Sequence, residues 1–251
     1  MRAIAFDIYG TYAHFKAWYM TTSRTTYPLP PRTALAGIIG AIMGIEREDL
    51  PTWCAVGNGI RFGVRSLKPI KMRILVVKGL RGPAVLSLTG KKGGKRVEVN
   101  WLKDNSPPRI PLEVIDQPEY RAYVHFPQDS DLNKLSERIQ GSRPHFRPYL
   151  GTANMIAYFR EKVLNFDIKT TGPGTGKLAG LVPKETAQLD VQELRRNNVR
   201  LTEVVAQSAV TESFAFHHGE FLMDMGAIGI PGRLAMDFNH VIDDGLTIPL
   251  I

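Results

Sequence analysis

Two segments of this sequence interleave aromatic rings with cations and hydroxyl groups, a combination that suits nucleic-acid binding. Rings stack on unpaired bases, while Lys, Arg and hydroxyl groups contact phosphates. The rings could instead cover a sheet edge while the hydroxyls form turns, and the second segment could be a rigid, proline-braced connector. The first segment, residues 11–27, contributes the candidate RNA contacts Tyr12, His14, Lys16, Thr22, Ser23, Arg24 and Tyr27; the second, residues 143–152, contributes Arg143, His145, Arg147 and Tyr149.

A third segment, Gly90 to Arg96, concentrates positive charge around three glycines. A glycine-rich, basic turn cannot bury itself, so we expect it to protrude, either as a solvated loop or as a finger laid along a phosphate backbone. It lies within an insertion expected at about residues 79–112. Its candidate RNA contacts are Lys91, Lys92, Lys95 and Arg96.

The charge balance favours a polyanionic partner if the positive residues cluster. Lys and Arg number 32 against 24 Asp and Glu, which gives a net charge of +8 and an isoelectric point near 9.6. The single cysteine, Cys54, excludes an internal disulfide and a cysteine-rich zinc site, and its expected role is a small buried hydrophobe. Without a long uncharged apolar run, neither a membrane anchor nor a secretory signal is expected, and we place the protein in the cytoplasm.

Two further motifs do not support a cofactor. Gly176-Lys177 lacks a glycine five positions earlier and is followed by Leu178, so it fails the spacing of a nucleotide-binding phosphate loop. His217 and His218 are adjacent, and neighbouring residues on a strand face opposite sides, so they are not expected to share a metal ion. We therefore expect no cofactor and no metal.

Hydrophobic periodicity predicts the elements that must position these residues. Strands are expected at residues 2–9, 60–66, 70–77, 120–126 and 155–163, with Ile74 and Val76 pointing inward. Helices are expected from Pro31–Thr33 to Gly44 and from a cap at Asp129 or Ser130 to Gly141, the second with Leu132, Leu135 and Ile139 as its buried stripe. This order predicts an α+β, ferredoxin-like (RRM-like) βαββαβ sandwich, with two helices on one face of an antiparallel sheet and the other face free.

The C-terminal third shows weaker patterns. Residues 183–210 receive no assignment, whereas residues 213–251 carry short alternating runs split by glycines, which predict β-hairpins. We therefore expect a ferredoxin-like unit at residues 1–165 and a small C-terminal β-hairpin subdomain at residues 166–251.

The stretch Thr26-Tyr-Pro-Leu-Pro-Pro-Arg-Thr-Ala-Leu-Ala-Gly-Ile-Ile-Gly-Ala-Ile-Met-Gly44 resembles the N-terminal signature of the CRISPR-associated Cas five family of the RAMP superfamily. Tyr149-Leu-Gly-Thr-Ala-Asn154 and the run from Gly229 to Asp237 support the resemblance. Arg32, within the signature, is a further candidate RNA contact.

The resemblance implies a ferredoxin-like palm with a basic thumb and a role in a type I Cascade, the ribonucleoprotein complex of antiviral defence or RNA-guided DNA targeting. There the family caps the 5′ handle of the crRNA beside the Cas seven backbone subunit and the large subunit, and target DNA is a possible further partner. We expect a non-catalytic RNA-binding subunit. The alternative is a metal-independent endoribonuclease that processes CRISPR precursor RNA, as in one branch of the family, for which Tyr149, His145 and His217 are the candidate residues.

The Arg24 guanidinium is expected to neutralise a phosphate. Arg24→Ala should weaken RNA binding and flatten the dependence of affinity on salt, because fewer counterions are released on binding. Equilibrium titrations over a range of salt concentrations measure both quantities. An unchanged salt slope would exclude Arg24 as a phosphate contact.

Overall fold

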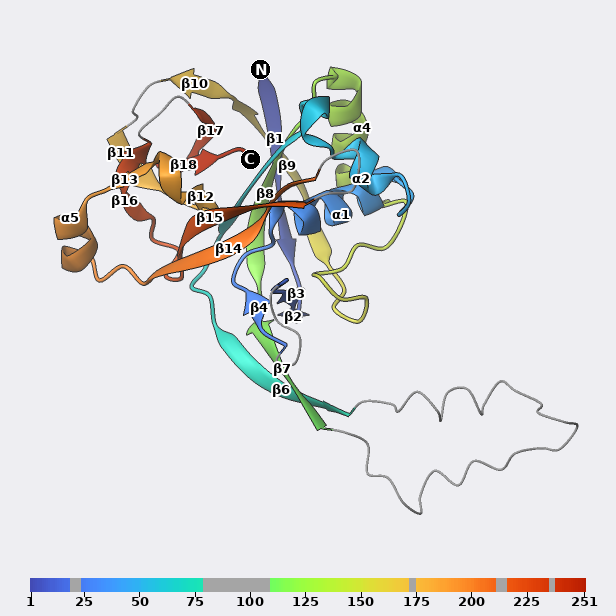
Figure 1. Cartoon of the computed structure of the whole chain (residues 1–251). Coiled ribbons are helices and arrows are strands. Elements are labelled where there is room, and N and C mark those ends of the chain that lie inside the picture. Colours follow the sequence, from blue (N-terminus) through green and yellow to red (C-terminus); the bar gives the residue numbers. More distant parts are fainter. Residues whose placement is uncertain (19–23, 79–108, 172–174, 211–215, 235–237) are drawn as a thin grey trace, which may run out of the picture.

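The computed structural model describes residues 1–18, 24–78, 109–171, 175–210, 216–234 and 238–251 (Figure 1). The fold is mixed α/β, with mostly strands and a few helices. Most of the predicted insertion lies outside the described residues. So do the candidate RNA contacts Thr22, Ser23, Lys91, Lys92, Lys95 and Arg96.

A four-stranded antiparallel sheet forms the centre of the protein. Its strands, in spatial order, are β5 (Arg61–Ser66), β8 (Glu119–His125), β1 (Arg2–Tyr9) and β9 (Tyr158–Asp167). Along the chain the sheet and its two long helices follow the predicted order strand, helix, strand, strand, helix, strand. In β1 the larger residues Ile4, Phe6 and Ile8 alternate with the small residues Ala3 and Ala5, so the two faces differ in bulk.

The larger face packs against the helices α1 (Arg32–Met43) and α4 (Asp129–Gln140). Leu35 of α1 and Leu135 of α4 share one core cluster with Phe6, and all three are fully buried. Helix α1 starts directly after Pro31 and ends at Gly44, which adopts a φ of 82° and donates its N–H to the Gly40 carbonyl. The predicted bounds of α1 and the buried stripes of both helices are confirmed. Helix α4 ends before Gly141 as predicted, but its N-cap is Gln128, so the predicted cap at Asp129 or Ser130 was wrong.

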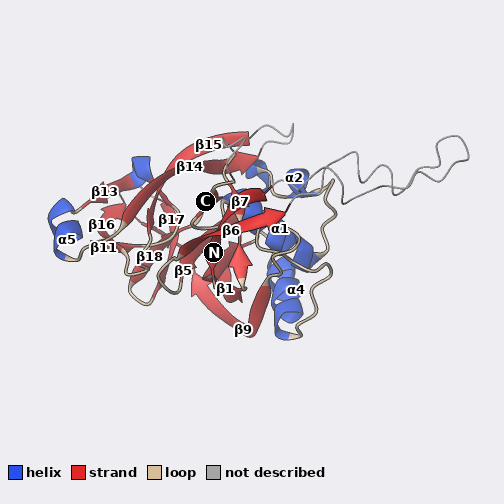
Figure 2. Cartoon of the chain, turned by 90° about the horizontal axis from the view of Figure 1, so that it is seen from below, coloured by secondary structure: helices blue, strands red, loops and turns tan. Residues whose placement is uncertain are grey.

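The smaller face is covered, which contradicts the expected free face. Ala3, Ala5 and Tyr123 form a second core with residues of the C-terminal region, among them Ile248 and Leu250. A Cβ on Gly180 would lie 1.9 Å from the carbonyl oxygen of Val64, so the C-terminal chain approaches the sheet backbone closely. Small side chains on this face therefore mark a packing surface. In Figure 2, α1, α2 and α4 lie on one side of the molecule and β11, β13, β16 and β18 on the other.

The C-terminal region is built almost entirely of strands. One sheet has the order β10 (Lys169–Thr171), β17 (Phe238–Asp243), β18 (Leu246–Pro249), β11 (Thr175–Leu178), β16 (Ile230–Leu234) and β13 (Ala187–Leu189). Another has the order β12 (Val182–Pro183), β15 (Phe216–Asp224) and β14 (Leu201–Val210). A hairpin expected within residues 213–251 is present as β17–β18, whereas β15 pairs with β14, which lies in the region that received no assignment. Val204 and Phe221 of the β14–β15 pair join the core around α1, so this ribbon is part of the main hydrophobic core.

Short helices complete the connections between strands. They are α2 (Leu50–Trp53), η1 (Val56–Asn58), η2 (Lys184–Thr186) and α5 (Val191–Arg196). Within the described ranges, no helix is long and apolar enough to cross a membrane.

A separate hairpin extends away from the central sheet (Figure 1). It pairs β6 (Met72–Lys78) with β7 (Arg109–Asp116), whose C-terminal end also pairs with β2 (Tyr12–Ala13). Ile74 and Val76 are 69% and 64% exposed, so the prediction that they point inward was wrong. The side chains of β6 do alternate as in a strand, but among the described residues no second layer covers the face that carries Ile74 and Val76.

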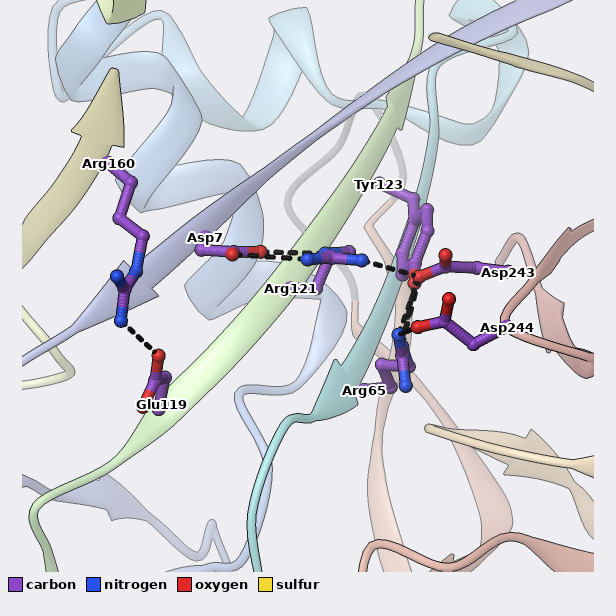
Figure 3. Close-up of polar contacts among 8 residues, drawn as sticks. All are labelled: Asp7, Arg65, Glu119, Arg121, Tyr123, Arg160, Asp243 and Asp244. Carbon is purple, nitrogen blue, oxygen red and sulfur yellow. Dashed lines mark hydrogen bonds and ion pairs between the residues drawn. The ribbon is translucent and has the colours of Figure 1, made fainter. Parts of the chain in front are cut away.

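A network of charges joins the central sheet to the C-terminal strands (Figure 3). Asp7, Arg121 and Arg65 lie side by side across β1, β8 and β5. Arg121 binds Asp7 with two hydrogen bonds of 2.7 and 3.1 Å. The carboxylate of Asp243, at the end of β17, accepts from Arg65 at 2.8 Å and from Arg121 at 3.0 Å.

Asp243 is the central acceptor of this network. Two adjacent guanidinium groups repel each other, and the Asp243 carboxylate lies between them, only 6% exposed. Tyr123 donates a further hydrogen bond to it. Burial alone would raise the pKa of Asp243, but the hydrogen bonds from Tyr123 and Arg121 and the attraction of Arg65 outweigh it, so this pKa lies below 3.8.

Asp243→Asn should lower the free energy of unfolding by about 3 kcal/mol at neutral pH, because it leaves the buried Arg65 with only the exposed Asp244 and the partly buried Arg121 with only Asp7. A carboxyl whose pKa is depressed in the folded state stabilises the fold above its unfolded pKa and loses that effect as the pH falls through its folded pKa. The difference between wild type and variant should therefore persist down to about pH 4 and shrink below 3.8.

The neighbouring Asp244 provides a matched control, because it also bonds Arg65 but is 71% exposed. Asp244→Asn should cost less than about 1 kcal/mol. Urea unfolding at several pH values measures both variants. Equal losses for the two would contradict the central role assigned to Asp243.

Candidate nucleic-acid interface

The two aromatic and basic segments meet at a groove beside α1. The groove has a volume of about 270 Å³. Lys16 comes from the first segment and Tyr149 from the second, although they lie far apart in the sequence. The lining residues are Phe15, Lys16, Trp18, Tyr27, Pro31, Thr33, Ala34, Gly37, Ile38, Leu50, Tyr149, Gly151 and Gln207.

The first wall is a small hairpin of β3 (Phe15–Lys16) and β4 (Thr26–Tyr27). The Thr26 side chain accepts from the Phe15 N–H, and the Thr26 N–H donates to the Glu113 carboxylate of β7 at 3.0 Å. These contacts fix the ends of the hairpin. Trp18 follows β3 with half of its surface exposed, and its ring centroid lies 4.2 Å from that of His218.

The second wall is the turn that carries Tyr149. Tyr149 forms a β-bridge with Ile156, and the Leu150 carbonyl accepts from the His14 N–H at 3.0 Å. Gly151 then adopts a φ of 90°, and a Cβ there would lie 1.9 Å from the His14 carbonyl oxygen. The turn can therefore lie against the first wall only with glycine at this position, and the Tyr149 side chain remains 46% exposed.

The remaining residues of the second segment lie against the C-terminal end of α1. The N–H groups of His145 and Phe146 donate to the carbonyls of Ile42 and Ala41. The His145 ring lies where a Cβ on Gly44 would approach it to 2.8 Å, so the glycine that ends α1 also makes room for this ring. Arg143, His145 and Arg147 are exposed.

Several exposed cations of the two aromatic and basic segments are available to an anionic ligand. Lys16, Arg24, Arg143 and Arg147 are exposed, and none of them forms an ion pair within the described ranges. A cation without a carboxylate partner keeps its full charge for phosphate. The residues predicted from the sequence thus include a set whose charge is unneutralised in the described part of the chain.

Three predicted RNA contacts are buried, which contradicts a contact through their side chains. Arg32 is 3% exposed and donates to the carbonyls of Cys54 and Ile60, and burial lowers its pKa. His14 is 3% exposed, and its Nδ1 lies 2.8 Å from the Glu113 carbonyl oxygen; burial lowers its pKa too.

The third is Tyr27, which is 3% exposed and donates its hydroxyl to the Val205 carbonyl. Tyr12 is partly buried against the main core. The sequence pattern could not separate these residues from their exposed neighbours, because burial of this segment depends on α1, β7 and β14. Cys54 is buried, as predicted.

Sequence reasoning missed Trp18 and Gln207 of the groove. Trp18 lies inside the first aromatic segment, so its exposed ring could have been included from composition alone. Gln207 belongs to β14, in the region without an assignment, and it accepts a hydrogen bond of 2.7 Å from Thr33 of α1. No local signal in the sequence places this amide beside the groove.

The groove does not resemble a metal centre. In the part of the chain that the structure describes, no three His, Cys, Asp or Glu side chains gather to hold a metal ion. Its chemistry is that of rings, amide groups and cations.

The sequence model of a protein family, described as CRISPR-associated protein (Cas_Cas5), matches residues 3–201. This match spans the central sheet, both long helices and every groove residue except Gln207. The chain belongs to this CRISPR-associated Cas_Cas5 family. The resemblance seen in the segment from Thr26 to Gly44 is thereby confirmed.

One solved structure shares the fold of this Cas_Cas5 member. A CRISPR protein from Archaeoglobus fulgidus is 13% identical, covers 100% of both chains and superposes with a TM-score of 0.56. A chain of a CRISPR RNA-guided surveillance complex is 13% identical over 92% of this chain and 90% of its own, with a TM-score of 0.48. Among curated proteins, no match to this sequence was found.

Gly151→Ala should lower the free energy of unfolding by at least about 2 kcal/mol, because a methyl group there meets the His14 carbonyl and a positive φ strains any other residue. Gly37→Ala is the matched control: it also lines the groove, but its Cβ would meet no atom within 4 Å. In a helix this change should stabilise by roughly 0.5–1 kcal/mol. Urea unfolding checks both, and a neutral Gly151→Ala would contradict the close contact of the two walls.

Proposed function

We propose that this chain is a non-catalytic RNA-binding subunit of a type I CRISPR Cascade complex, and that it caps the 5′ handle of the crRNA. Membership of the Cas_Cas5 family supports the CRISPR role. The observation that carries the RNA contact is the groove in which Lys16, Trp18 and Tyr149 converge from separate segments.

The groove offers the groups that single-stranded RNA requires. The rings of Trp18 and Tyr149 are about half exposed and can stack on unpaired bases. Gln207 accepts from Thr33 through its oxygen, so its amide nitrogen is left to donate to a base edge. Lys16 and the exposed arginines of the two segments supply charge for the phosphates.

The architecture supports a ferredoxin-like palm. The spatial order β5, β8, β1, β9 and the two helices on one face support this assignment. The β6–β7 hairpin, which carries the segment from 79 to 108 at its far end, supports a thumb at the predicted insertion. In this proposal the Cas seven backbone subunit and the large subunit are the protein partners, and the assembly operates in the cytoplasm.

The alternative function is a metal-independent endoribonuclease. Two histidines, His145 and His217, are exposed and could exchange protons with RNA. The His145 ring packs edge-on against Phe146 at 4.6 Å between centroids and makes no hydrogen bond within the described ranges. That arrangement gives it no partner to orient a proton transfer, so we favour the non-catalytic role.

Tyr149→Ala should weaken binding of a CRISPR repeat RNA about tenfold by removing one stacking surface. The logarithm of the RNA-binding constant falls linearly with the logarithm of the salt concentration, and Lys16→Ala should reduce the size of this slope by about 0.7, the value for one phosphate of a single strand. Lys134→Ala, on the exposed outer face of α4, is the control and should change neither quantity. Fluorescence anisotropy at several salt concentrations measures all three.

If Tyr149→Ala and Lys16→Ala both keep the wild-type affinity and salt dependence, the groove is not the RNA-binding site. Cleavage of the repeat RNA at one position in the presence of a chelator, lost in His145→Ala or His217→Ala, would establish the endoribonuclease instead. Copurification of a tagged chain, with sequencing of the bound RNA, identifies the partner subunits and the handle.

A further inference from the structure

A second hollow lies at the edge of the central sheet, next to the groove. Its volume is about 630 Å³. Residues 147–149 border both hollows, because Arg147 and Pro148 line the second and Tyr149 lines the first. The lining of the second hollow is Tyr9, Ser142, Pro144, Arg147, Pro148, Ile156, Ala157, Tyr158, Phe159 and Glu161.

Two tyrosines form an exposed aromatic surface in this hollow. Tyr9 ends β1 and is the register partner of Tyr158, which begins the edge strand β9. Their rings are stacked, with centroids 5.7 Å apart and an angle of 27° between their planes. They are 40% and 50% exposed, and neither hydroxyl has a hydrogen-bond partner in the described part of the chain. The two rings therefore lie mainly at the protein surface and add little to the hydrophobic core.

Cations surround this aromatic pair. The Arg160 guanidinium lies 5.7 Å from the centroid of the Tyr9 ring, held there by a 2.6 Å hydrogen bond to Glu119, which Figure 3 shows. Arg147 lines the same hollow, is exposed and has no ion pair within the described ranges. The carboxylate on the wall, Glu161, accepts a hydrogen bond from Ser142.

Exposed stacked rings beside arginines suit a ligand with an aromatic face and a negative charge. An unpaired nucleotide has both groups, joined at a fixed short distance. A protein segment of matching chemistry would need an aromatic residue next to an acidic one. The net charge of +8 and the groove beside Tyr149 favour the nucleotide.

We propose that the Tyr9–Tyr158 pair stacks a second unpaired base of the same RNA strand, with Arg147 on its phosphate. This inference rests on the proposed function, because the strand held in the groove would continue past residues 147–149 into the second hollow. The chain would then hold two bases splayed on either side of one turn, which fixes the direction of the strand across the protein surface.

Photocrosslinking of the full chain to a single-stranded RNA with bromouridine at every position tests the proposal. Peptide mapping should find crosslinks at Tyr9 or Tyr158 in addition to those at Trp18 or Tyr149. Tyr158→Ala should abolish the first set, keep the second and weaken RNA binding about tenfold. Tyr158→Phe keeps the ring and should behave like wild type.

The outcomes separate the two proposals. Crosslinks confined to Trp18 and Tyr149 would overturn the second base site and leave the proposed function intact, whereas crosslinks confined to Tyr9 and Tyr158 would overturn the groove as the main site. Wild-type RNA affinity in Tyr158→Ala would also overturn the inference. Loss of a copurifying protein subunit from Tyr158→Ala, with unchanged RNA crosslinks, would reassign the hollow to a protein partner.

Discussion

The structure depends on one buried carboxylate. Asp243 lies between Arg65 and Arg121 and accepts a hydrogen bond from Tyr123. Without it, Arg65 would keep only the exposed Asp244 and Arg121 only Asp7, and no carboxylate would lie between the two guanidinium groups on neighbouring strands. The same carboxylate therefore neutralises the central sheet and attaches the C-terminal strands to it. A buried, multiply bonded contact of this kind defines one relative position of the two layers, because a shift of either one leaves charges unpaired.

Covering the second face of the sheet has a direct consequence for function. The alanines of β1 and Tyr123 are buried beneath Ile248 and Leu250, so this second face of the sheet cannot serve as a platform for RNA bases. Ligand contacts must instead use the loops and edges. Both hollows lie at such positions, one beside α1 and one at the start of β9. Functional side chains on loops can be exposed without opening the core.

Close backbone contacts position these loops. Gly151 lets the Tyr149 turn lie against the chain at His14, and Gly44 ends α1 while leaving space for the His145 ring. In each case the absence of a side chain leaves room for two segments that are distant in the sequence to approach each other closely. The groove is therefore a product of packing between segments, and its exposed rings are held by backbone hydrogen bonds within rigid surroundings.

The sequence by itself determined the order of the main elements, the bounds of α1, the buried stripes of α1 and α4, and the family, because these depend on local periodicity and on the short motif that includes Pro31 and Gly44. It also marked both aromatic and basic segments. Only the tertiary structure decided which of their residues face solvent. His14, Tyr27 and Arg32 are buried by elements distant in the sequence, while Lys16 and Tyr149 remain exposed. It likewise decided that the second face of the sheet is covered and that Gln207 reaches the groove, because contacts between distant segments leave no periodic trace in either segment.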